Sequence, residues 1–190
     1  MGAIGAATAR RARAFGMEIA YTNRNDADPA LVRELGAVIE LKDPKAVLAE
    51  LQQWGPVLEE LRSASQRPGA RFPVAYNAEN PWSILLPHLA IVKRLTQILA
   101  VRAQAELALD QTDAAAQDLV LALRLLNTSR DEPILISHLV RMACVQIVTQ
   151  PLWEGCHRHQ WSAVHLARFQ ELCAATDLMA GLNLTLSAER

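Results

Sequence analysis

Residues 103–126 carry the sequence AQAELALDQTDAAAQDLVLALRLL, which decides the fold of the larger part of the chain. Alanine and leucine are strong helix formers, and the polar segment 111–113 separates two runs of them. Within that segment, Thr112 or Asp113 can cap the second run. Four apolar residues of the second run share one helical face: Leu119, Ala122, Leu123 and Leu126. The stretch therefore predicts two helices joined as a hairpin.

This predicted hairpin is weakly similar to a tetratricopeptide repeat. It has small residues at the helix crossing, a short turn, and a proline, Pro133, after its exit. A second copy is not evident at the expected period of about 34 residues. The predicted fold class is therefore mainly α, a helical-hairpin bundle in which the repeat is not established.

Helical patterns continue on both sides of the hairpin. Turn and proline signals predict further helices at 44–65 and 131–150, and the first helix of the hairpin is predicted to span 82–109. Pro151 and Gly155 are expected to interrupt the helix that begins near residue 131, and Gln160 or Ser162 is expected to open a last helix that ends near Leu178. Residues 80–180 also resemble helical bacterial proteins that have no assigned function, a likeness that implies an α-hairpin fold and no chemistry.

The composition excludes several classes of protein. Half of the residues are apolar (51%) and 21% are charged, which argues against disorder. A net charge of -1 and 5% aromatics argue against a nucleic-acid partner. The apolar runs at 82–92 and 142–153 are too short to span a membrane, and nothing before Arg10 resembles a secretory signal. Three cysteines fit a reducing compartment, so a cytoplasmic location is expected.

The first forty residues have a different pattern, in which predicted helices alternate with predicted strands. A helical pattern at 6–15 is followed by an alternating pattern at 18–22, which is typical of a strand. Asp28 and Pro29 then open a second helix, and 37–41 suits another short strand. This order predicts a small, incomplete Rossmann-like α/β fragment whose opening strand is missing.

Residues 2–41 resemble the NAD(P)-binding domain of D-isomer-specific 2-hydroxyacid dehydrogenases, especially the glyoxylate and hydroxypyruvate reductase branch. The resemblance is carried by Gly2-x-x-Gly5, the run ARRARAFGM at 9–17, the pair Asn23-Arg24 and the run ELGA at 34–37. It implies that the glycine turn holds a dinucleotide pyrophosphate, and that the pair after the second strand favours NADP over NAD. The implied cofactor-binding residues are Gly2, Ala3, Ile4, Gly5, Asn23 and Arg24.

The sequence departs from that family in two places. Met1 stands between the first and second glycines of the motif, so the first glycine and the preceding strand are lacking. After Leu41, no counterpart is evident to the Arg, Glu and His that handle the substrate in the family. We therefore expect no complete active site and no bound cofactor, with NADP as the alternative. The abrupt change after Leu41 also fits a fusion made in gene prediction.

The pattern divides the chain into a truncated dinucleotide-binding-like segment (1–42), a helix with a linker loop (43–79) and an α-helical domain (80–190). The leading hypothesis is a structural or protein-interaction domain, able to bind a partner or to self-associate through its helices. The alternative is an NADP-dependent 2-hydroxyacid dehydrogenase fragment that is active only when its missing parts are supplied.

No side chain outside the N-terminal segment is predicted to be catalytic or metal-binding. Cys144, Cys156, His157, His159 and His165 include residues that ligate zinc, but their spacing does not place four of them together. His88 and His138 are expected to be core histidines with backbone partners.

Two further segments have structural interpretations. The acids of 130–132 are expected to complement a helix dipole. The extended segment 71–76 is expected to lie across the bundle and to bury Phe72 and Tyr76, with peptide docking as an alternative.

Overall fold

The computed structural model describes residues 43–67, 69–76 and 84–188, and every regular element in these ranges is a helix. The predicted mainly helical fold is therefore confirmed, whereas the predicted Rossmann-like fragment lies outside the described residues. The chain divides into two compact units, 1–44 and 45–190. The helices are α3 (Pro44–Leu51), η1 (Gln52–Trp54), α4 (Gly55–Ala64), α5 (Pro87–Ala108), α6 (Thr112–Leu126), η3 (Asn127–Ser129), α7 (Leu135–His157), α8 (Ala163–Ala174) and α9 (Leu178–Ala188).

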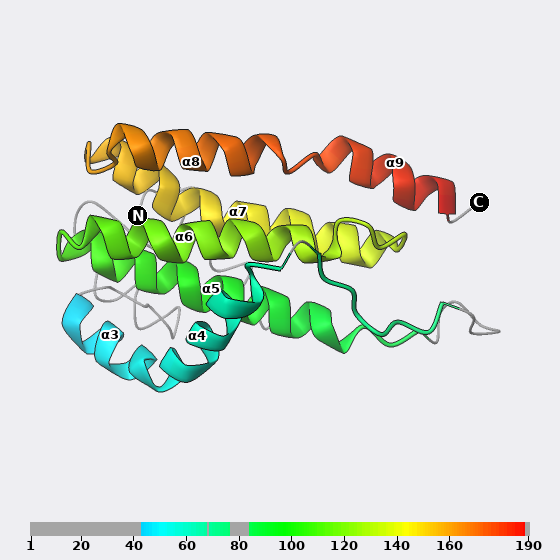
Figure 1. The fold of residues 1–190 in the computed structure, drawn as a ribbon, viewed down its shortest axis with the longest axis horizontal. Coiled ribbons are helices and arrows are strands. Elements are labelled where there is room, and N and C mark those ends of the chain that lie inside the picture. The colour runs from blue at the N-terminus through cyan, green and yellow to red at the C-terminus, as the bar shows by residue number, and fades with distance from the viewer. Residues whose placement is uncertain (1–42, 68, 77–83, 189–190) are drawn as a thin grey trace, which may run out of the picture. The chain divides into compact units, whose positions relative to one another are not determined.

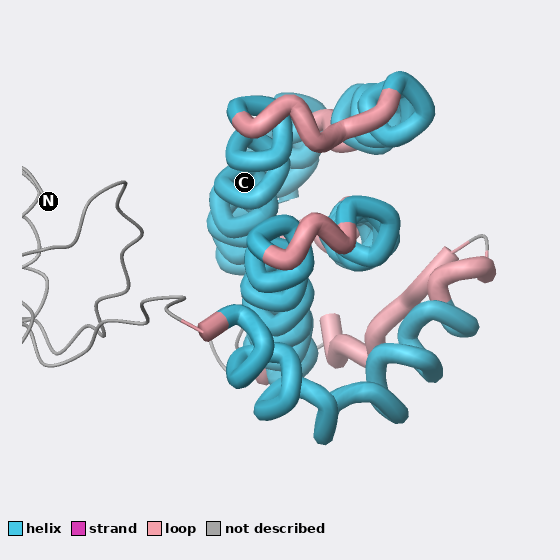
Figure 2. The backbone as a smooth tube through the Cα atoms, turned by 90° about the vertical axis from the view of Figure 1, so that its left-hand side faces the viewer, coloured by secondary structure: helices cyan, strands magenta, loops and turns pink. Residues whose placement is uncertain are grey.

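Stacked helical hairpins make up the second unit. Helix α5 packs against α6 and α7, while α6 also packs against α8, and α9 packs on α7. Viewed along the helices, the α5–α6 hairpin lies on the α7–α8 hairpin, with both turns at the same end (Figure 2). Helices α3 and α4 curve beneath the α5–α6 hairpin, and α8 and α9 follow one another on the opposite side (Figure 1).

Small side chains allow α5 and α6 to pack closely. Five alanines of these helices are at most 4% exposed: Ala103, Ala105, Ala115, Ala116 and Ala122. Larger apolar side chains fill the space around them, and Leu99, Leu107 and Leu119 are fully buried. Burial of each such side chain is worth about 1.5 to 3 kcal/mol, so this cluster is the main source of stability in the unit.

The two hairpin turns are built alike and are joined. Each contains a residue in the left-handed region, Asp110 (φ 59°) and His159 (φ 55°), and both residue types adopt it more readily than most. The side-chain amide of Gln160 donates a hydrogen bond to the Leu107 carbonyl at 2.9 Å and another to Asp110 Oδ1 at 3.0 Å. The second turn therefore fastens the first and satisfies a carbonyl at the end of α5.

Helix α7 continues through both residues that were expected to end it. Pro151 lies inside the helix, and Gly155 lies against the indole of Trp161. A Cβ at Gly155 would come within 2.2 Å of Trp161 Cε2, so only glycine fits there. Trp161 Nε1 also donates to the Leu152 carbonyl at 2.9 Å. The predicted break was wrong because this packing outweighs the local helix-breaking tendency.

Other predicted boundaries have mixed outcomes. Ser162 caps α8 by accepting a hydrogen bond from the His165 N–H, which confirms one of the two proposed starts. Helix α6 begins at Thr112, preceded by Gln111 without a side-chain cap, so the expected capping role of Thr112 or Asp113 was wrong. Helix α5 begins at Pro87 rather than in the segment near residue 82.

Helix α9 was not predicted. It follows Asp177, whose side chain accepts a hydrogen bond from the Ala180 N–H at 2.9 Å. Gly181 lets α9 approach α7 closely, since a Cβ there would lie 2.9 Å from His138 Nδ1. Arg141 of α7 adds a hydrogen bond of 3.4 Å to the Asp177 carbonyl. These contacts explain why a short helix docks where the sequence indicated only the end of the previous one.

None of the helices in residues 43–67, 69–76 and 84–188 combines the length and the apolar content that crossing a membrane requires.

Candidate functional site

The cofactor-binding residues implied by the dehydrogenase resemblance all precede residue 43. Gly2, Ala3, Ile4, Gly5, Asn23 and Arg24 therefore lie outside the described residues. The candidate site below is built from the second unit alone.

The residues weighed as metal ligands are dispersed. In the described part of the chain, no three His, Cys, Asp or Glu side chains form a group that could hold a metal ion. Cys144 is fully buried in α7, and its burial raises the pKa of the thiol, while Cys156 and Cys173 are exposed. His165 instead pairs with Asp113, with 3.2 Å between Nε2 and Oδ1.

The two core histidines have different surroundings. Both are buried, as expected, but the partner of His88 is not a backbone group. Its Nε2 lies 2.8 and 3.1 Å from the two carboxylate oxygens of Glu132, and its ring stacks on Phe72 with 4.2 Å between centroids. For His138, burial and then the nearby Arg141 lower the pKa.

Two other predictions, one on Glu132 and one on the segment 71–76, are corrected in this region. Glu132 is buried and lies ahead of α7, so it holds the start of α5 rather than complementing a helix dipole. Residues 71–76 form neither a helix nor a strand, and backbone hydrogen bonds from Val74 to Phe72 and from Tyr76 to Val74 make tight turns in them. Phe72 is half-buried, whereas Tyr76 is 39% exposed rather than buried.

A buried charge network joins α4 to the α5–α6 hairpin. Asp118 is fully buried and accepts hydrogen bonds from Arg62 Nη2 at 2.5 Å and from Arg102 Nε at 2.7 Å. Arg102 also contacts Glu106 at 3.3 Å. Burial, and next the negative charge of Asp118, raise the pKa of Glu106 from 4.5 to about 7. The network positions α4, and it leaves two buried atoms, Arg62 Nε and Glu106 Oε2, without a hydrogen-bond partner among the described residues.

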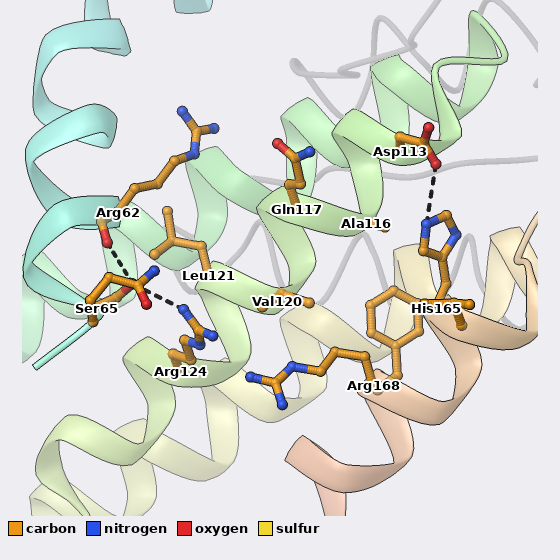
Figure 3. A pocket seen from close by; sticks show the side chains of 13 residues that line it. Arg62, Ser65, Asp113, Ala116, Gln117, Val120, Leu121, Arg124, His165 and Arg168 are labelled. Carbon is orange, nitrogen blue, oxygen red and sulfur yellow. Dashed lines mark hydrogen bonds and ion pairs between the residues drawn. The ribbon is translucent and has the colours of Figure 1, made fainter. Parts of the chain in front are cut away.

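An open cavity of about 400 Å³ lies over α6, between the end of α4 and helix α8 (Figure 3). Its apolar lining comes from Ala116, Val120 and Leu121 of α6 and from Val164 and Phe169 of α8. Polar and charged side chains line the rest of it: Arg62, Ser65, Gln66, Asp113, Gln117, Arg124, His165 and Arg168. The arrangement can bury an apolar side chain and bind a polar group beside it.

A second cavity of about 600 Å³ adjoins the first. The two share Ser65, Gln66, Leu121 and Arg124. The second extends towards residues 69–72 and the start of α5, where its lining is mainly apolar: Leu61, Phe72, Ile91, Val92, Leu95 and Leu125. We refer to the two adjoining cavities together as the α6 groove.

The α6 groove is not evident in the sequence, because its walls come from distant parts of the chain. A weak signal existed in α6 itself, where Gln117, Val120 and Arg124 recur at helical spacing opposite the buried face. That pattern is also what an exposed helix face shows, so it does not distinguish a groove from plain surface.

Comparison of the chain with family models, with curated proteins and with solved structures gives no match. The geometry of the second unit therefore carries the functional argument.

Proposed function

We propose that residues 45–188 form a helical-hairpin interaction domain, weakly similar to tetratricopeptide hairpins, that binds a partner polypeptide in the α6 groove. A segment of this kind would place apolar side chains against Val120, Leu121 and Phe169. Grooves between packed helices are a common place for peptide recognition, because the helices fix the groove's shape before the ligand arrives.

The observation that carries this proposal is the groove itself. Its cavities of about 400 and 600 Å³ join along α6 and lie open to solvent, although the surrounding helices are tightly packed. The charge network of Asp118 holds α4, which forms one wall of the groove, in place against the α5–α6 hairpin. A purely structural helical stack has no need of such an opening.

Selection of displayed short random peptides on the full chain tests the proposal. Selected peptides should bind Val120→Trp about tenfold or more weakly than the unmodified chain, because the indole would fill the groove. Val57→Trp is the matched control, since Val57 is 42% exposed on α4 and lines neither cavity. Failure to select any peptide, or equal binding by both variants, would contradict the proposal.

A second candidate function is dinucleotide binding by the N-terminal segment. The observation that favours it is the resemblance of residues 2–41 to a dehydrogenase NAD(P)-binding domain, with Asn23-Arg24 suited to a 2′-phosphate. A fluorescence titration of the full chain with NADPH tests it, with NADH and Arg24→Glu as comparisons. Saturable binding of NADPH that weakens in Arg24→Glu supports this candidate, and absence of saturation contradicts it.

A further inference from the structure

We propose that the α6 groove takes an acidic segment, in which Asp or Glu side chains alternate with apolar ones. This inference rests on the proposed function and specifies the chemistry of the partner.

The first argument is the balance of charge around the groove. Its lining includes the arginines Arg62, Arg67, Arg124, Arg130 and Arg168, and the acids Asp113 and Asp131. The whole chain has nearly equal numbers of basic and acidic residues, 19 Lys and Arg against 20 Asp and Glu. The excess of positive charge is therefore local to the groove, and it favours a partner of opposite charge.

The second argument is that two of these arginines are poorly compensated. Arg62 has the buried carboxylate of Asp118 at 2.5 Å. Arg124, by contrast, has one hydrogen bond among the described residues, a contact of 3.4 Å with the neutral hydroxyl of Ser65. Arg168 pairs with Glu171, whose side chain is 66% exposed, and an ion pair this exposed contributes little.

These two arginines approach each other. Arg168 extends across the groove from α8 towards Arg124 on α6 (Figure 3). Both side chains are half-buried, so water screens their mutual repulsion less than it would at a fully exposed site. A carboxylate placed between them would relieve the repulsion, and the planar guanidinium group suits carboxylates by offering paired N–H donors.

The shape of the groove favours a chain segment over a single small anion. Arg168 lies at one end, Arg124 where the two cavities meet, and Arg67 and Arg130 in the second cavity. Apolar surface lies between these charges, from Phe169 and Val120 in the first cavity to the apolar wall of the second. An extended acidic segment can use all of these positions, whereas one carboxylate uses only one.

Three displayed peptide libraries, panned on the full chain, test this inference. All three libraries have random apolar residues at some positions. The remaining positions are Asp/Glu in the acidic library, Asn/Gln in the uncharged library and Lys/Arg in the basic library. Peptides from the acidic library should be selected, and their fluorescence anisotropy should show binding that weakens as NaCl is raised. The double variant Arg124→Glu/Arg168→Glu should lose about tenfold or more in affinity for them and should prefer the basic library.

The control is Arg71→Glu, because Arg71 is exposed and lines neither cavity; it should bind the acidic peptides as the unmodified chain does. If the double variant does not fold by circular dichroism, Arg124→Gln decides the matter by removing charge while keeping the side-chain length. Selection of uncharged or basic peptides that Val120→Trp blocks would overturn the inference and leave the interaction domain standing. Selection of no peptide from any library would overturn the proposed function as well.

Discussion

The α5–α6 hairpin and the α7–α9 region pack their helices by different means. In α5–α6, buried alanines such as Ala103 and Ala122 let the helices approach along their whole length. In α7–α9, close approach occurs at single glycines, with Gly155 against Trp161 and Gly181 beside His138. Packing by many small residues spreads the contact over a surface, whereas packing at one glycine makes the contact depend on a single missing Cβ. The two regions should therefore respond differently to mutation.

The largest effect is expected from a cavity in the α5–α6 hairpin. Leu119 is fully buried, and Leu119→Ala should lower the free energy of unfolding by about 3 kcal/mol, through lost burial and the cavity left behind. Denaturant unfolding measures this. Leu166→Ala is the control, because Leu166 on α8 is 44% exposed, and it should cost less than about 1 kcal/mol. Equal losses in both variants would show that the hairpin is not the main core.

The second expected effect tests the single-glycine contact of α7. Gly155→Ala places a Cβ 2.2 Å from the Trp161 ring and should cost about 2 kcal/mol through overpacking. Gly55→Ala is the matched control, since no other atom lies within 4 Å of the added Cβ in α4. It should change the free energy of unfolding by less than about 0.5 kcal/mol, because Gly55 is the first residue of α4 and is followed by a proline. A neutral Gly155→Ala would mean that Trp161 moves away at little cost.

The third prediction concerns the pH dependence of the α5–α6 hairpin. The pKa of Glu106 is about 7 in the folded chain against an ordinary 4.5, so between these pH values the folded chain retains a proton that the unfolded chain loses. The free energy of unfolding should therefore fall as pH rises through this window, by at most about 1.4 kcal/mol per pH unit. Denaturation at pH 5 and pH 8 should show that Glu106→Gln removes this fall and that Glu60→Gln, at an exposed position of α4, keeps it. Identical pH profiles for all three proteins would contradict the assignment.

The smallest effect is expected where the two regions are joined. Gln160→Ala removes the hydrogen bonds from the second turn to Leu107 and Asp110 and should cost about 0.5 to 1 kcal/mol. The control is Gln170→Ala at an exposed position of α8, which should stay within about 0.5 kcal/mol of the unmodified chain. A loss no larger than the control's would mean that helix packing alone sets how the hairpins stack.

The same difference explains which parts of the fold the sequence predicts. The α5–α6 hairpin follows from helix formers and a polar break, because its signals are local. The continuation of α7 past Pro151 depends on Trp161, and the docking of α9 depends on contacts from Gly181 to His138 and Arg141. The low helix propensity of proline and glycine argues against helix at these positions, and the contacts that overcome it come from residues distant in sequence. The sequence pattern alone therefore does not predict them.

The candidate site was less predictable than the fold. Arg62, Arg124 and Arg168 are separated by dozens of residues, and their meeting in the α6 groove depends on how α4 and α8 pack on α6. Buried Glu132 was interpreted from its position near a helix start, whereas its role follows from His88, which lies in another helix. Charged residues are ambiguous in sequence because their partners determine their role.

The burial of Cys144 makes the rate at which its thiol is alkylated a measure of how often the helix stack opens. Its thiol lies in the core between α7 and α5, near the hydroxyl of Thr96, whereas Cys156 and Cys173 are exposed. Because alkylating reagents attack the thiolate, and burial raises the Cys144 pKa and shields the sulfur, the two exposed cysteines should be modified first. Alkylation of Cys144 would then require α7 to separate from α5. Mass spectrometry of the alkylated chain could therefore measure the rate of this opening without an introduced cysteine.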